Sequence, residues 1–132
     1  MQGWQAAPGQ TLLVPSGPGL HLFFLVLGPV VLADYGAAPQ LAMVNASTLR
    51  EDLPYDSACV LEVGEHPFVR RRSYLAYRHM RLDASQHVEK MVRSAVWTPH
   101  DACSTELLQR IVAGVCRSRL APREYKRIFR CP

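Results

Sequence analysis

The apolar run from Leu20 to Ala33 places the strongest constraint on the fold of this 132-residue chain. It is shorter than the ~20 apolar residues of a membrane-spanning helix, and Gly28-Pro29 interrupts it. Glycine followed by proline is typical of a turn, and both residues disfavour the interior of a helix. The run therefore predicts a buried strand over 20–27, a turn at 28–29 and a second strand over 30–33, with no association with a membrane.

The length and composition are typical of one folded domain. Hydrophobic residues make up 48% of the chain and charged residues 20%, a balance that supports a packed core rather than disorder. The first ten residues lack the basic segment and apolar run of a secretion signal. We therefore expect a single domain over 1–132, located in the cytoplasm.

The four cysteines indicate thiols rather than a disulfide framework. Cys59, Cys103, Cys116 and Cys131 contain no CxxC pair, and Cys59 and Cys116 lie in apolar stretches where cysteine acts as a small buried hydrophobe. His100 and Cys103 have a ligand-like spacing, but no second close pair completes a tetrahedral zinc site. We therefore expect reduced cysteines, no metal and no cofactor.

The chain has a net charge of +4, and its positive residues are clustered in two regions of the sequence. One cluster is the run Arg70, Arg71 and Arg72, followed by Arg78 and Arg81. The other is the C-terminal segment, which carries Arg117, Arg119, Arg123, Lys126, Arg127 and Arg130 against the single acid Glu124. Such clusters favour a polyanion, because neutralised phosphates release condensed counterions. A solvated surface that maintains solubility is an equally strong interpretation.

Short strands and one helix account for most of the remaining chain. Strands are predicted at 11–14, 40–44 and 58–63, with turn residues at 64–67. From Ser104 the apolar period becomes that of a helix, with Ser104 as its N-cap and Pro122 as the limit to any continuation. The pattern predicts a mainly β (α+β) domain, a small, partly open barrel with a C-terminal amphipathic helix. It leaves the basic tail, 118–132, open between a short helix and an arm.

The segment from Ser73 to Asp83 is predicted as one strand whose two faces differ. Successive side chains of a strand point to opposite faces. One predicted face carries Ser73, Leu75, Tyr77, His79, Arg81 and Asp83, and the other carries Tyr74, Ala76, Arg78, Met80 and Leu82. The second face is mostly apolar and is predicted to pack on the core, whereas the first gathers polar groups near its C-terminal end.

The order of these segments resembles the MazF/PemK family of toxin endoribonucleases. The resemblance covers about residues 9–117 and is carried by four segments, Gly9 to Val14, His21 to Leu27, Ser73 to Asp83 and Ser104 to Gly114. It implies an SH3-like barrel, metal-independent cleavage of single-stranded RNA to a 2′,3′-cyclic phosphate, control by an antitoxin protein, and a homodimer. Gln10 departs from the family's acidic residue, and His21 from its arginine.

The polar face of the segment 73–83 carries the residue types that metal-free RNA cleavage requires, namely a base, a cation and a donor to phosphate. We hypothesise that Asp83 or His79 is the base, that Arg81 stabilises the phosphorane, and that Ser73 donates to a phosphate oxygen. Each has a structural alternative. Arg81 and Asp83 form a surface ion pair, His79 is a partly exposed strand residue, and Ser73 begins the strand.

Further residues are candidates for RNA contact. They are His21, His66, Arg70, Arg71, Arg72 and Arg78. His21 lies where the resembled family has its site arginine, and His66 precedes the arginine run within a Glu-His-Pro turn. A buried structural histidine is the alternative at both positions, and a solvated loop is the alternative for the arginines.

Two other classes of function remain open. The departures at Gln10 and His21 favour a catalytically inactive barrel that binds RNA or a protein. A structural assembly subunit that buries a dimer interface is the third possibility.

Overall fold

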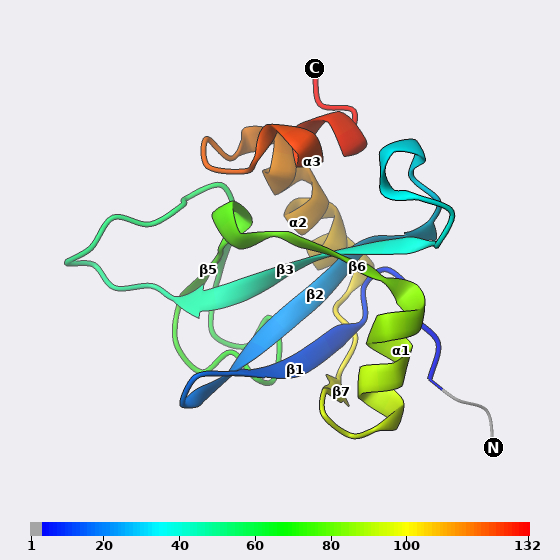
Figure 1. Cartoon of the computed structure of the whole chain (residues 1–132). Helices are drawn as coiled ribbons and strands as arrows, with labels where there is room; N and C mark the ends of the chain where they lie inside the picture. Colours follow the sequence, from blue (N-terminus) through cyan, green and yellow to red (C-terminus); the bar gives the residue numbers. More distant parts are fainter. Residues whose placement is uncertain (1–3) are drawn as a thin grey trace.

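The computed structural model describes residues 4–132 as an antiparallel sheet with helices on both faces (Figure 1). The strands are β1 (Thr11–Ser16), β2 (Gly19–Val30), β3 (Gln40–Thr48), β4 (Val60–Leu61), β5 (Ser73–Leu75), β6 (Arg81–Ala84) and β7 (Thr98–His100). The helices are α1 (Ser85–Arg93), α2 (Thr105–Arg117) and α3 (Arg123–Ile128), with 3₁₀ turns η1 (Ala33–Tyr35) and η2 (Tyr77–His79).

The sheet is not closed. Its order is β4-β5-β3-β2-β1-β7, and β6 also pairs with β3, so β4 and β7 form the two ends of the pairing path. The predicted fold class is confirmed: a mainly β, α+β fold with a partly open barrel and a C-terminal amphipathic helix. None of the helices in residues 4–132 is long and apolar enough to cross a membrane.

The apolar run that was predicted as two strands forms one long strand, β2, which ends at Val30, so the second predicted strand over 30–33 is absent. The predicted turn at Gly28-Pro29 is wrong, because the chain continues beside β3 to the pair Val30↔Gln40. The register shifts between Leu25 and Leu27 and again before Val30, so irregular pairing takes the place of a reversal. Gly28 has φ +100°, and a Cβ there would lie 2.2 Å from the backbone oxygen of Gln40, so only glycine fits.

The sheet separates two cores. On one face Phe24 and Leu75 pack with Leu107, Ile111 and other residues of α2 and α3. On the other face Phe23, Leu25 and Met43 pack with Val88 of α1 and with Trp97. Adjacent residues of β2 thus serve opposite cores, as the alternation of a strand requires. Figure 1 shows α1 on one side of the sheet and α2 with α3 on the other.

The segment from Ser73 to Asp83 is not one strand. It pairs with β3 twice, as β5 and as β6, and the turn η2 lies between. From Ala46 to Met43 β3 runs three residues, whereas its partner runs six, from Leu75 to Arg81. The partner therefore holds three extra residues, an odd number, which reverses the faces of all that follows.

The predicted faces of this segment are consequently wrong. Leu75 and Tyr77, which were assigned to the polar face, are fully buried in the core beneath α2. Met80 and Leu82 from the opposite predicted face pack against the same core, as was predicted for that face. Within each short strand the predicted neighbours still share a face, Ser73 with Leu75 in β5 and Arg81 with Asp83 in β6.

The C-terminal helix begins at its predicted N-cap and ends before the predicted limit, Pro122. The Ser104 hydroxyl accepts a hydrogen bond from the Leu107 amide at 3.1 Å, and α2 ends at Arg117. The following tail is folded: it forms α3, whose Tyr125 is buried and donates from its hydroxyl to the Met80 carbonyl at 3.1 Å.

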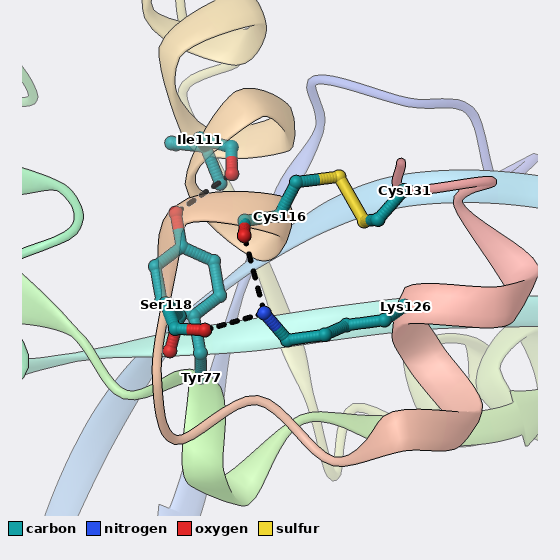
Figure 2. Close-up of a disulfide and its surroundings, with 6 residues drawn as sticks. All are labelled: Tyr77, Ile111, Cys116, Ser118, Lys126 and Cys131. Atoms are coloured by element: carbon teal, nitrogen blue, oxygen red, sulfur yellow. Dashed lines mark hydrogen bonds between the residues drawn. A yellow bond between two sulfur atoms is a disulfide. The ribbon is translucent and has the colours of Figure 1, made fainter.

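A disulfide joins Cys116 at the end of α2 to Cys131 beyond α3 (Figure 2). The prediction that all cysteines are reduced is therefore wrong for this pair, because the return of α3 brings the two Cα atoms to 5.3 Å. Cys59 is a buried thiol, as expected, and Cys103 is a partly buried one. Burial raises the pKa of both thiols.

Helix α1 and strand β7 have no counterpart in the sequence prediction. Val88, Met91 and Val92 give α1 an apolar stripe at helical spacing, and Val88 is fully buried. The helix has only nine residues, so the periodic pattern of apolar residues that could predict it is short. β7 pairs with β1 over Thr98 to His100.

Candidate functional site

An open cleft of about 310 Å³ lies on the α1 side of the sheet, beside the β1–β2 hairpin. β2 supplies His21 and Phe23 to the cleft, and β3 supplies Asn45 and Ser47. Phe23 is paired with Asn45, so these alternate residues project from one face of adjacent strands. η2 and β6 add His79 and Arg81, which completes a wall of two imidazoles and one guanidinium.

The Arg81 guanidinium is held in a fixed orientation. Its Nε lies 2.6 Å from Asp83 Oδ2 and its Nη2 lies 3.0 Å from Asp83 Oδ1, a bidentate pair. Its central carbon lies 5.8 Å from the ring centroid of Phe23 and 5.4 Å from that of Trp97. The Arg81 side chain keeps 38% of its surface exposed, so the guanidinium is positioned yet accessible from the cleft.

Asp83 binds Arg81 and does not line the cleft. Both of its carboxylate oxygens accept hydrogen bonds from Arg81, and only 11% of the side chain is exposed. Asp83 is also absent from the residues that line the cleft. Its geometry is that of a residue that orients a cation, which removes it from the candidates for a general base.

His21 and His79 reach the same cleft from distant parts of the chain. His21 on β2 is half-buried, and His79 at the end of η2 is exposed. An imidazole exchanges protons near neutral pH, and two imidazoles at one site can act as an acid and a base. Of the predicted site residues, the fold therefore brings together His21, His79 and Arg81.

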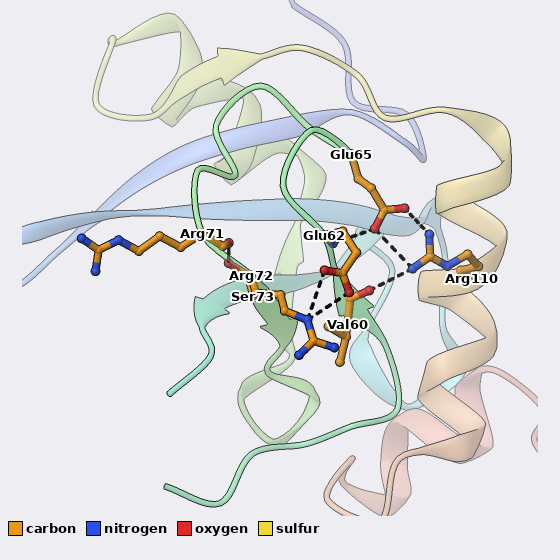
Figure 3. A network of polar contacts seen from close by, with 7 residues as sticks. All are labelled: Val60, Glu62, Glu65, Arg71, Arg72, Ser73 and Arg110. Atoms are coloured by element: carbon orange, nitrogen blue, oxygen red, sulfur yellow. Dashed lines mark hydrogen bonds and ion pairs between the residues drawn. The ribbon is translucent and has the colours of Figure 1, made fainter. Parts of the chain in front are cut away.

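Ser73 lies apart from the cleft. It is buried, and its hydroxyl donates to the Arg71 carbonyl at 2.8 Å (Figure 3). It lines an adjoining hollow of about 220 Å³ beside Phe68 and Val69, which shares His21 and Ser47 with the cleft but not His79 or Arg81. This geometry fixes the start of β5 and does not place Ser73 beside His79 and Arg81.

His66 is a buried structural residue. Its ring is 1% exposed, its Nδ1 accepts the Phe68 amide at 3.1 Å, and its Nε2 lies 2.7 Å from the Asp101 carbonyl. An Nδ1 that accepts requires the proton on Nε2, so the ring is neutral. Thr11 donates to the same Asp101 carbonyl at 2.7 Å. The predicted contact of His66 with RNA does not fit this burial.

We expect the fold to become less stable as the pH is lowered, because of His66. Burial, with the nearby His100, lowers the His66 pKa, so the unfolded chain binds a proton more readily than the folded chain. The pKa of a histidine in the unfolded chain is about 6.5. The contribution of His66 to the free energy of unfolding is therefore fully present above about pH 6.5 and is lost as the pH falls below it.

Urea titrations at several pH values measure this loss, which for one proton reaches at most ~1.4 kcal/mol per pH unit. A His66→Gln variant retains His100 and is expected to lose most of the dependence between pH 7 and 5. An unchanged dependence in that variant would assign the effect to another group.

The arginine run is exposed but differs from residue to residue. The Arg72 Nε donates to both carboxylate oxygens of Glu62, at 3.1 and 3.0 Å (Figure 3). On the same loop Glu65 forms an ion pair with Arg110 of α2, which ties the loop to the helix. Within residues 4–132, Arg70, Arg71 and Arg78 have no carboxylate partner, and they remain available to phosphate.

The polar residues that β3 supplies to the cleft were not predicted. Asn45 and Ser47 follow the predicted strand 40–44, and the Asn45 amide donates to the Ser47 hydroxyl at 3.4 Å. The available signal was alternation: with β3 extended to Thr48, both residues share the face of Met43. Across residues 4–132, no three His, Cys, Asp or Glu side chains are grouped as metal ligands would be.

No family model matches this chain, and no curated protein matches it.

Proposed function

We propose that this protein is an endoribonuclease that cleaves single-stranded RNA without a metal ion. The observation that carries the proposal is the cleft that joins His21, His79 and the Asp83-held guanidinium of Arg81. The three side chains provide a base, an acid and a fixed cation, which are the groups that cleavage through the 2′-hydroxyl requires. The exposed Arg70, Arg71 and Arg78 supply charge that attracts the phosphate backbone.

In this scheme each cleft residue has one role. His79 accepts the proton of the 2′-hydroxyl as its oxygen attacks phosphorus, and the bond from phosphorus to the 5′-oxygen breaks. His21 gives a proton to the departing 5′-oxygen, and Arg81 stabilises the charge on the phosphorane. The products are a 2′,3′-cyclic phosphate and a free 5′-hydroxyl. The two histidines, and not Asp83, carry the protons in this scheme, because both carboxylate oxygens of Asp83 already accept hydrogen bonds from Arg81.

The test is to incubate the protein with a long single-stranded RNA in EDTA and to map the new ends. We expect cyclic phosphate ends with wild type and a loss of cleavage with His79→Ala. His87→Ala is the matched control, because His87 is an exposed histidine on α1 outside the cleft. Intact RNA with folded wild-type protein would reject the enzyme.

A catalytically inactive RNA-binding module is the second candidate, and the position of Gln10 favours it. Gln10 stands where the resembled family has an acidic residue, and its amide holds the N-terminal backbone. Its Oε1 accepts the Ala7 amide at 3.0 Å and its Nε2 donates to the Gln5 carbonyl at 3.0 Å. RNA that is bound but remains intact in the assay above would select this candidate.

The resemblance to the MazF/PemK toxins also supports an antitoxin protein that covers the cleft, a homodimer, and a cytoplasmic location. The Cys116–Cys131 disulfide counts against the cytoplasm, because reducing compartments keep most thiols reduced. Alkylation of thiols in intact cells decides between them: modification of both cysteines supports the cytoplasm, and protection of both supports an oxidising compartment.

A further inference from the structure

Another hollow, of about 270 Å³, lies away from the cleft, on the α2 side of the sheet. Its walls are the loop between β3 and β4 and the turn between α2 and α3, which approach each other in Figure 1. Tyr55 contributes from the loop, and Arg117, Arg119 and Leu120 contribute from the turn. The hollow therefore joins an aromatic ring to two guanidinium groups.

The carboxylate that lines this hollow is already hydrogen-bonded. Asp56 accepts the Ala58 amide at 3.0 Å and the Ser118 hydroxyl at 2.5 Å, and it is buried. Among the described residues, no carboxylate pairs with Arg117 or Arg119, although both are exposed. Their charge is directed to solvent, where it can meet an anionic ligand.

The turn that carries the arginines is held firmly. Ser118 lies between them, and its hydroxyl accepts the amides of Leu120 and Ala121, both at 3.0 Å. The Lys126 ammonium donates to the carbonyls of Cys116 at 3.1 Å and Ser118 at 2.6 Å, beside the disulfide (Figure 2). Lys126 thus satisfies carbonyls at the end of α2 and leaves the two arginines as the free cations of the turn.

Tyr55 is placed to stack on a base. Its side chain is 38% exposed, and its ring lies 5.8 Å from the ring of Tyr74 at a tilt of 39°. A neighbouring ring restricts Tyr55 and lowers the entropy that it loses on binding. Leu120, 42% exposed, adds an apolar contact on the opposite wall.

We propose that this hollow is a second binding site for single-stranded RNA, in which Tyr55 stacks on a base while Arg117 and Arg119 contact the flanking phosphates. Exposed aromatic rings beside cations are the general means of binding a single strand without sequence preference. The choice of RNA rests on the proposed function, but the site itself performs no chemistry. It would hold a long strand while the cleft acts on another part of it.

The test measures binding of a long 2′-O-methyl oligouridine, which lacks the attacking hydroxyl and cannot be cleaved through it. Tyr55→Ala is expected to weaken binding on the order of tenfold, because one stacked base is lost, and Tyr55→Phe is expected to retain it. Arg119→Gln is expected to reduce the slope of log K against log salt by about 0.7, the contribution of one phosphate contact on a single strand.

Matched controls distinguish a localised binding site from non-specific attraction of RNA by the positive charge of the whole protein. Leu53→Ala removes an exposed apolar side chain of the same loop, and Arg93→Gln removes one charge on α1; neither residue lines the hollow. Equal effects of controls and site variants, or no binding by wild type, would overturn the proposal. Cleavage of a dinucleotide, which is too short to span both sites, tests the cleft alone, so failure of either site is distinguished from failure of the other.

Discussion

We expect alanine in place of Arg81 to abolish the proposed RNA cleavage while the protein stays folded. The guanidinium is the fixed cation of the cleft, and the loss of one preorganised donor to transition-state charge lowers turnover by about 10²–10³. The arginine side of the ion pair with Asp83 is more than one-third exposed, but Asp83 is only 11% exposed, so the carboxylate that loses its partner is expected to cost about 1–3 kcal/mol of stability. Single-turnover cleavage in EDTA, with a thermal melt of the same sample, measures both effects.

A second Arg-Asp pair offers a matched control. Arg50 and Asp52 have the same spacing along the chain and a contact of 3.0 Å, but they lie outside the cleft. Arg50→Ala is therefore expected to leave cleavage unchanged. If Arg81→Ala cleaves as fast as Arg50→Ala, then Arg81 has only a structural role and the proposed mechanism fails.

Asp83→Asn separates position from charge at the same site. Arg81 remains in this variant, but its bidentate partner is neutral and holds it less firmly. We expect slower cleavage at saturating RNA with little change in RNA affinity, since the phosphate-binding cation is retained. A variant that also lost the acid limb of the pH–rate profile would show that Asp83 itself carries a proton.

Local signals in the sequence were sufficient for elements whose structure is decided locally. The helix after Ser104 was predictable because its cap and its apolar stripe lie within one segment, and the structure has both. The strands around Thr11, Gln40 and Val60 were predictable in place, although β4 is only two residues long. The partly open barrel followed from the number and order of such segments.

Features that depend on distant partners were not predictable. Alternation assigned Leu75 and Tyr77 to the polar face, because no local signal reports the three extra residues that η2 inserts beside β3. Gly28-Pro29 resembles a turn, yet β3 pairs on both sides of it and carries the strand through. The disulfide likewise depends on the reversal of the chain between α2 and α3.

The candidate site shows the same division. Arg81 and Asp83 were predicted as neighbours because they are two residues apart on one strand, and they form a bidentate pair. His21 joins Arg81 in one cleft because β3 lies between β2 and β6, an arrangement set by long-range pairing. Ser73 was assigned to that site on the assumption of one continuous strand, and the interruption at η2 separates it.

Alanine in place of Gly114 is expected to destabilise the fold by roughly 2–4 kcal/mol, from overpacking and the loss of one buried hydrogen bond. Elsewhere in a helix this change is usually stabilising. Here a Cβ would lie 2.0 Å from the Tyr77 hydroxyl oxygen and 2.6 Å from Cζ of that ring. Tyr77 is fully buried, and its hydroxyl donates to the Ile111 carbonyl at 2.7 Å (Figure 2), so the ring has no free space to enter. Urea unfolding measures the loss.

A double variant tests whether the contact between Gly114 and Tyr77 is the cause. Tyr77→Phe alone removes the hydroxyl and leaves the Ile111 carbonyl with one fewer donor, at a cost of ~1–3 kcal/mol. In the presence of Gly114→Ala the same change also removes the atom nearest to the new methyl group. The double variant is therefore expected to lose less stability than the sum of the two single variants. Additive costs would place the damage of Gly114→Ala elsewhere in α2. A stabilising Gly114→Ala would show that α2 does not pack against Tyr77 as closely as this structure has it.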